Sequence, residues 1–134
     1  MTADEARARF AAARVARLAT IGPGGPALVP ICFAVDGDVI LMAVDHKPKR
    51  TRSLARLRNV ASDPRVSLLV DWYEDEDWSR LWWARADGTA RVLEACDRAV
   101  ELLGLRHAQY RETPPAGPVM EITVQRWSGW AADG

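Results

Sequence analysis

The stretch ALVPICFAVDGDVILMAV, residues 27–44, contains two β-rich runs joined by the tripeptide DGD at 36–38. Asp-Gly between two such runs is a strong hairpin signal, because these residues tolerate the positive φ angles of tight hairpin turns. Pro30 lies inside the first run and has no N–H to donate to a neighbouring strand. We therefore predict strands over 27–35 and 39–44, with Pro30 facing an edge, a bulge or a ligand.

The rest of the chain carries further strand and helix patterns. Additional strands are predicted over 15–21, 66–72, 81–93 and 119–124. Within 81–93, the Asp87-Gly88 pair predicts either a tight turn or a glycine bulge. Helices are predicted from Thr2 to about Ala13 behind a Thr2-x-x-Glu5 capping box, from Thr51 or Ser53 to about Ala61, and from Cys96 to about Gln109.

These patterns amount to six strands and about three helices in a chain of 134 residues. Most strands are joined by short connections, which favour antiparallel pairing. Six short antiparallel strands bury both of their faces best by closing into a small barrel. We therefore predict an α+β fold, a six-stranded antiparallel barrel with the helices packed outside, and a single domain over 1–134.

The composition argues against several classes of protein. Lys+Arg and Asp+Glu are both 18, so the net charge is zero and a broad nucleic-acid-binding surface is not expected. No apolar run approaches the length of a membrane span, and MTADEARARF at the N-terminus lacks the apolar region of a signal peptide. We expect no membrane association and a cytoplasmic protein.

The chain offers little for metal binding or nucleophilic catalysis. Its two cysteines, Cys32 and Cys96, and its two histidines, His46 and His107, have no metal-ligand spacing. The serines lack a nucleophile elbow, and His107, on a helical stripe, fits a structural role. We expect no metal, and no catalytic residue can be named.

A basic stretch stands out because both lysines of the chain lie in it. The sequence VDHKPKRTRSLARL, 44–57, runs from a strand through a basic turn into a helix. Free N–H groups at a helix N-terminus and the nearby charges of Lys47, Lys49, Arg50 and Arg52 favour an anion, most simply a phosphate. Arg56 lies four residues after Arg52, so the two share a helix face and could extend the site toward a longer acidic ligand. A solvated basic turn is the alternative.

Four of the six tryptophans lie between positions 72 and 83. Trp82 and Trp83 are adjacent on a predicted strand, so they point to opposite faces, and the outward one suggests a subunit interface or a stacked planar ligand. Trp78 lies in a polar loop without core periodicity. The C-terminal RWSGW, 126–130, is too aromatic for a free tail, and we expect it to dock on the barrel or across a dimer interface.

In their order, these segments resemble a known superfamily. The most specific parts are K-x-K-R-T-R-x-L running into D-P-R-V, and W-x-x-x-W-W-x-R-A-D-G-T-A-R-V. The chain is similar, from Val15 to about Trp130, to the flavin- and deazaflavin-binding split β-barrel proteins typified by pyridoxine 5′-phosphate oxidase. Within them it most resembles the branch of oxidoreductases that depend on the deazaflavin coenzyme F420.

The resemblance implies a six-stranded split barrel that forms a homodimer, with cofactor grooves at the subunit interface. It places the cofactor phosphate against Lys47, Lys49, Arg50 and Thr51. It places the ring along Pro30, Ile31 and Cys32 and near Val44 and Asp45, and it brings Trp78 in from its own or the partner subunit. It also makes Asp87-Gly88 a bulge within one long strand.

The function implied is hydride transfer between the deazaflavin F420 and an unidentified small substrate. The cofactor carries the chemistry in such a reaction, so the lack of an evident acid–base pair is no objection. The alternatives are an oxidase-type enzyme that binds flavin mononucleotide (FMN), a non-enzymatic cofactor-binding protein and, in last place, a small nucleic-acid-binding barrel.

Overall fold

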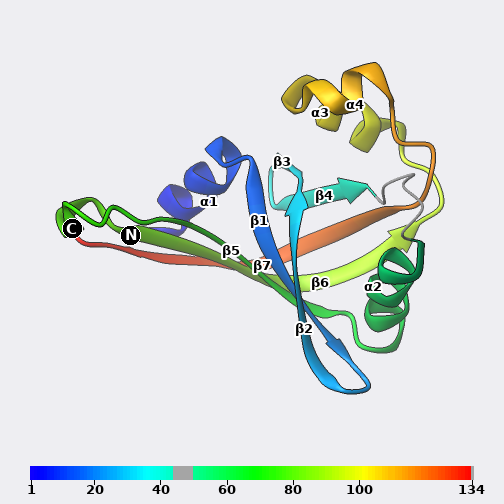
Figure 1. Cartoon of the computed structure of the whole chain (residues 1–134), viewed down its shortest axis with the longest axis horizontal. Coiled ribbons are helices and arrows are strands. Elements are labelled where there is room, and N and C mark those ends of the chain that lie inside the picture. The colour runs from blue at the N-terminus through cyan, green and yellow to red at the C-terminus, as the bar shows by residue number, and fades with distance from the viewer. Residues whose placement is uncertain (44–49, 134) are drawn as a thin grey trace.

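The computed structural model of the chain describes residues 1–43 and 50–133, with side chains at 1–43 and 55–133. In those residues, seven strands form one antiparallel sheet in the order β2-β1-β5-β6-β7-β4-β3, and four α-helices pack around it (Figure 1). The strands are β1 (Val15–Gly22), β2 (Gly25–Cys32), β3 (Ala34–Asp36), β4 (Val39–Ala43), β5 (Arg65–Trp72), β6 (Trp82–Leu93) and β7 (Val119–Ala131). The helices are α1 (Ala3–Ala12), α2 (Arg50–Ser62), α3 (Asp97–Arg106) and α4 (Ala108–Glu112), with a 3-10 turn, η1, at Trp78–Arg80.

The α+β class and the antiparallel sheet are confirmed, but six strands was wrong, because the predicted strand 27–35 divides at Phe33. The Phe33 side chain is fully buried, and its ring lies edge-on to that of Phe10, with 5.9 Å between centroids. The chain therefore leaves β2, which pairs with β1, and starts β3, which pairs with β4. Alternation alone cannot show this break, since β-type residues stand on both sides of it.

Three helices was also too few, because the predicted helix 96–109 divides at His107. His107 has an extended backbone with φ −124° and ψ 115°, between α3 and α4. Its ring Nε2 donates to the carbonyl oxygen of Phe33 at 3.0 Å. This contact to a residue 74 positions away turns the chain at a point where local sequence favours a continuous helix.

The longest ladder of the sheet joins β6 to β7 and contains the predicted irregularity. Asp87 pairs with Arg126 and Gly88 with Val124, so the register shifts and Gln125 of β7 is the extra residue. The bulge alternative is therefore confirmed and the tight turn excluded. β7 is also longer than the predicted strand 119–124, and RWSGW forms its last part, paired with β6.

The sheet has two different faces. On the inner face, alternate residues of the central strands form a core closed by Phe10 of α1, whose ring also lies edge-on to Trp127 at 5.4 Å. Ala84 and Ala86 of β6 are fully buried there. Residues that pair directly across neighbouring strands share a face of the sheet. By this register, several large apolar side chains lie exposed on the outer face: Val15, Ile21, Leu28, Leu69, Trp83 and Trp130.

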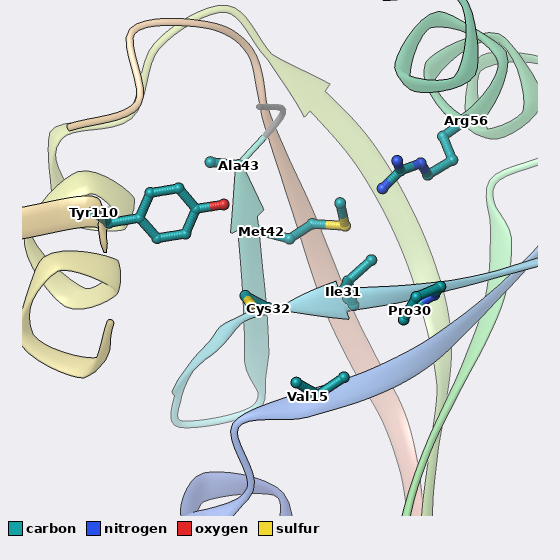
Figure 2. Close-up of a pocket in the computed structure, with 8 residues that line it drawn as sticks. All are labelled: Val15, Pro30, Ile31, Cys32, Met42, Ala43, Arg56 and Tyr110. Carbon is teal, nitrogen blue, oxygen red and sulfur yellow. The ribbon is translucent and has the colours of Figure 1, made fainter. Parts of the chain in front are cut away.

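The two ends of the sheet come near each other without pairing. β2 is the terminal strand at one end, and close to it passes β4, the next-to-last strand at the other end (Figure 2). This is the arrangement expected of a split barrel, although it has seven strands. Across 1–43 and 50–133, the helices are too short or too polar to cross a membrane.

The bulge requires glycine at position 88, which yields a prediction for stability. A Cβ on Gly88 would overlap the carbonyl oxygen of Thr123 and lie 2.9 Å from its carbonyl carbon, and both atoms are rigid backbone. We expect Gly88→Ala to lower the free energy of unfolding by about 1–3 kcal/mol or more, as overpacking does. Urea denaturation followed by tryptophan fluorescence measures this change. Gly24→Ala is the control, because nothing lies within 4 Å of its Cβ position, and equal losses in the two variants would contradict the analysis.

Candidate functional site

A cavity of about 300 Å³ lies where the two ends of the sheet approach each other (Figure 2). Pro30, Ile31 and Cys32, at the end of β2, form one side of it. The other lining residues come from four different elements: Val15 of β1, Met42 and Ala43 of β4, Arg56 of α2 and Tyr110 of α4. The three residues predicted on β2 to contact a cofactor ring are therefore together in one cavity.

The cavity lies at the rim of the exposed sheet face. Val15 pairs directly with Cys32 and Arg17 with Pro30, so these side chains share the outer face. Ile31 points inward and is buried. Because Pro30 has no N–H, this part of β2 is poorly suited to carry another strand. Pro30 therefore lies on an edge strand, one of the three options that the sequence left open for this proline.

The middle of the cavity is apolar and its polar groups lie at two ends. Ile31 and Met42 lie between the Arg56 guanidinium on one side and the Tyr110 ring on the other (Figure 2). A planar, mainly apolar ligand with polar groups at its edges would match this arrangement, since ligand sites combine an apolar lining with a few well-placed polar groups.

Arg56 is the charged residue of this lining. Its Nε is buried and finds no hydrogen-bond acceptor in the described residues. A buried charged donor without a partner is costly, so its environment favours a ligand that supplies an acceptor. Arg56 was predicted at the edge of an anion site, and the structure places it directly in the cavity.

Four lining residues were not predicted as site residues: Val15, Met42, Ala43 and Tyr110. Val15, Met42 and Ala43 follow strand patterns, and Tyr110 comes just after the helix that was predicted to end near Gln109, so none of them had a local signal for a site. Tyr110 reaches the cavity because the chain turns at His107, which fixes α4 through its bond to Phe33. The rings of His107 and Tyr110 lie edge to face, with centroids 6.0 Å apart.

A second arginine holds α3 and α4 in place. Arg106, at the end of α3, donates to the carbonyl oxygens of Ala11 and Ala13 at the end of α1. Burial, with a smaller contribution from the nearby charge of Arg14, lowers the pKa of Arg106 from its usual range. These bonds tie the α3–α4 unit to the body of the protein on the side where Tyr110 contributes to the cavity.

Several predicted cofactor ligands lie outside the described residues: Val44, Asp45, Lys47 and Lys49. Arg50 begins α2 and Thr51 follows it, but their side chains are also outside the described part. The predicted phosphate site therefore stays a prediction. In the described residues, no group of three His, Cys, Asp or Glu side chains could hold a metal ion.

Trp78 does not line the cavity of its own chain. It lies in η1, on the connection between β5 and β6, beside the C-terminus and at the opposite end of the sheet from α2 (Figure 1). Its side chain is 65% exposed. The η1 turn is capped by Asp77, whose carboxylate accepts from the backbone N–H and the hydroxyl of Ser79, at 3.1 and 2.6 Å.

A larger cleft of about 690 Å³ lies between the β1–β2 turn and the second half of α2. Two of its polar side chains already have partners. Asn59 donates to the hydroxyl of Thr20 at 3.1 Å. The side chain of Arg65 hydrogen-bonds Asp63 and lowers the pKa of that carboxyl to about 2. We take the smaller cavity as the candidate site, because it is lined by the predicted ring-binding residues and by Arg56. The Nε of Arg56 is buried and has no hydrogen-bond partner in the described residues.

Comparisons with known proteins place the fold in a family context. The protein family described as pyridoxamine 5′-phosphate oxidase matches residues 2–131. A comparison with curated proteins gives no match. Among solved structures, a conserved hypothetical protein from Mycobacterium tuberculosis superposes with a TM-score of 0.75 at 22% identity, covering 98% of this chain and 86% of that one.

Two further structures, both from Mycobacterium smegmatis, carry names that mention a ligand. The FAD binding protein has a TM-score of 0.66 at 16% identity, covering 97% of this chain and 95% of that one. The heme binding protein has a TM-score of 0.72 at 22% identity, covering 98% of this chain and 55% of that one. At these identities the likeness shows a shared fold.

The cap of the Trp78 turn yields a prediction of pH behaviour. Hydrogen bonds from the Ser79 side chain and then its backbone hold the pKa of Asp77 below its usual range. The ionised carboxylate therefore stabilises η1 above the ordinary Asp pKa, and this contribution is lost as pH falls through the lowered value. We expect Ser79→Ala to raise the Asp77 pKa toward 3.8, measured by NMR titration of the side-chain carboxyl carbon. Asp63 is the internal control, since its low pKa depends on Arg65, and an unchanged Asp77 titration would refute the assignment.

Proposed function

The chain belongs to the pyridoxamine 5′-phosphate oxidase family, and from this premise we propose that it is an oxidoreductase that binds a flavin-type cofactor in the cavity between β2 and β4. The observation that carries the proposal is the position of Pro30, Ile31 and Cys32. These residues, on which the sequence resemblance places a cofactor ring, line a cavity together with Arg56 and Tyr110.

The residues of the cavity fit such a cofactor. A flavin or deazaflavin ring is flat, with apolar surfaces and hydrogen-bond acceptors along its pyrimidine edge. Ile31 and Met42 would pack against the ring, and the unpartnered Nε of Arg56 would donate to an acceptor on its edge. The FAD binding protein from Mycobacterium smegmatis has the same fold, which supports a flavin-type ligand.

We further propose that the cofactor is the deazaflavin F420, on the likeness of the basic stretch 47–54 with DPRV at 63–66, and of the tryptophan-rich segment 78–92, to that branch. When bound, F420 supplies the hydride chemistry. The residues of this chain would hold the ring, keep water from one side of it and leave the other side open to a small substrate. FMN, with an oxidase-type reaction, is the alternative cofactor, and a cofactor-binding role without catalysis is the alternative function.

We propose a homodimer that covers the outer sheet face. This face exposes apolar side chains on neighbouring strands, with the exposed Arg17 and Arg85 among them, and a gathering of exposed apolar side chains on one face commonly marks an interface. Leu28 is 69% exposed, and Trp83 and Trp130 are directly paired across β6 and β7. The cavity opens at the rim of the same face, so a second copy would border it. In such a dimer, Trp78 would approach the ring from the partner subunit. Within one chain, Trp78 lies at the opposite end of the sheet from α2, which contributes Arg56 to the cavity.

The cofactor proposal is tested by titrating the protein with F420, FMN and FAD while following tryptophan quenching. Tightest binding of F420 would support the deazaflavin assignment, tightest binding of FMN or FAD would replace it with a flavin, and binding of none would overturn the proposal.

The predicted phosphate site is tested with the double variant Lys49→Ala and Arg50→Ala. We expect it to weaken the binding of F420 or FMN by about 1.5–3 kcal/mol for each charge-assisted hydrogen bond lost. Riboflavin, which lacks the phosphate, is the control ligand, and it should bind both proteins alike. Unchanged affinity for the phosphorylated cofactor would contradict the phosphate site.

The dimer is tested by placing a charge on the outer face. We expect Leu28→Arg to shift the protein toward the monomer in sedimentation velocity, because a buried unpaired charge at an interface is unfavourable. Leu105→Arg is the matched control: Leu105 is also 69% exposed, but it lies on α3 and not on the sheet face. The proposal fails if wild-type protein is monomeric, or if the two variants dissociate to the same extent.

A further inference from the structure

We infer that Arg56 makes the cavity select the reduced, anionic form of a flavin over its oxidised, neutral form. This inference rests on the proposed function, and it goes further by assigning a role to one residue. It follows from the charge, the burial and the position of the Arg56 side chain.

Among the residues that the structure describes, the cavity contains a positive charge without a counter-charge. Arg56 is its cationic lining residue, and the described lining residues include no aspartate or glutamate. The seven ion pairs found in the described residues do not involve Arg56. Its Nε is also buried without an acceptor. The guanidinium therefore brings a positive charge into the cavity.

The position of Arg56 directs this charge at one end of a bound ring. Its guanidinium points from α2 toward Met42 and Ile31, whereas Tyr110 enters from α4 on the other side of Met42 (Figure 2). The residues between them are apolar, and Tyr110 offers a single hydroxyl, whereas the Arg56 guanidinium offers several N–H donors and a positive charge. The pyrimidine edge, with its several carbonyl oxygens and ring nitrogens, is therefore expected to face Arg56.

The chemistry of flavin makes this edge sensitive to oxidation state. Two-electron reduction adds the equivalent of a hydride to the ring, and in neutral or mildly alkaline water the reduced ring carries a negative charge on its pyrimidine part. The oxidised ring is neutral there. A charge near this edge tunes the electronics of the cofactor. Because the guanidinium lies in a partly buried site, its attraction for the anion is stronger than it would be in water.

The test measures binding of oxidised FMN and of dithionite-reduced FMN, without oxygen and at mildly alkaline pH. The wild-type protein should bind reduced FMN more tightly than oxidised FMN. Arg56→Gln, which keeps hydrogen-bonding ability but removes the charge, should reduce this preference by about tenfold or more, the usual effect of losing one charge-assisted hydrogen bond. Arg56→Lys should retain most of the preference, because it keeps the charge.

The matched control is Arg58→Gln. Arg58 lies on the same helix and undergoes the same change of charge, but it lines the larger cleft beside the β1–β2 turn and not this cavity. Its variant should keep the wild-type preference. Thermal unfolding of each variant shows whether it is folded, and a preference that is lost in Arg58→Gln as well would overturn the inference in favour of a general charge effect.

The remaining outcomes separate this inference from the proposed function. If FMN binds and Arg56→Gln keeps the wild-type preference, the inference is overturned while the flavin-type site stands. If the protein binds F420 or FAD but neither form of FMN, the inference is overturned and the proposed function again stands. If none of the three cofactors binds, both are overturned.

Discussion

The burial of Phe33 is the constraint on which the rest of the structure depends. Its ring packs against Phe10 of α1, and its carbonyl oxygen accepts a hydrogen bond from His107. The guanidinium of Arg106 lies 5.9 Å from the same ring centroid. One residue thus joins the first helix, the break between β2 and β3, and the α3–α4 unit. Because the chain turns here to bury this side chain, β2 and β3 pair with different neighbours and lie at opposite ends of the sheet.

The split has a functional consequence, because it puts the end of one strand beside the middle of another without pairing them. The space left between Pro30–Cys32 and Met42 is the candidate site. Its polar groups come from helices, Arg56 from α2 and Tyr110 from α4. This division is physically sensible: strands give a rigid apolar wall, and side chains that reach in from helices provide the few hydrogen bonds and the charge that orient a ligand.

Local features of this protein were predictable from sequence because they depend on residues that are near one another in the chain. The capping box of Thr2 and Glu5 forms as expected, with hydrogen bonds of 3.1 and 2.7 Å. The 36–38 hairpin connects two strands as predicted, with Gly37 at φ 62°. Gly88 could be recognised as a turn or a bulge, but the choice depended on whether β7 lay alongside, which no local pattern states. The ring-binding assignment of residues 30–32 came from resemblance, and the structure places all three in one cavity.

The sequence by itself therefore determined where the chain forms strands, where it forms helices and which short segment contains both lysines. Those properties follow from alternation, capping and composition. Only the tertiary structure decided that Phe33 divides one predicted strand, that His107 divides one predicted helix, and that Tyr110 joins residues 30–32 at one cavity. It also decided that Trp78 lies at the opposite end of the sheet. These outcomes depend on burial and on hydrogen bonds between residues tens of positions apart, and such long-range contacts override local preference when they satisfy groups that would otherwise be buried without a partner.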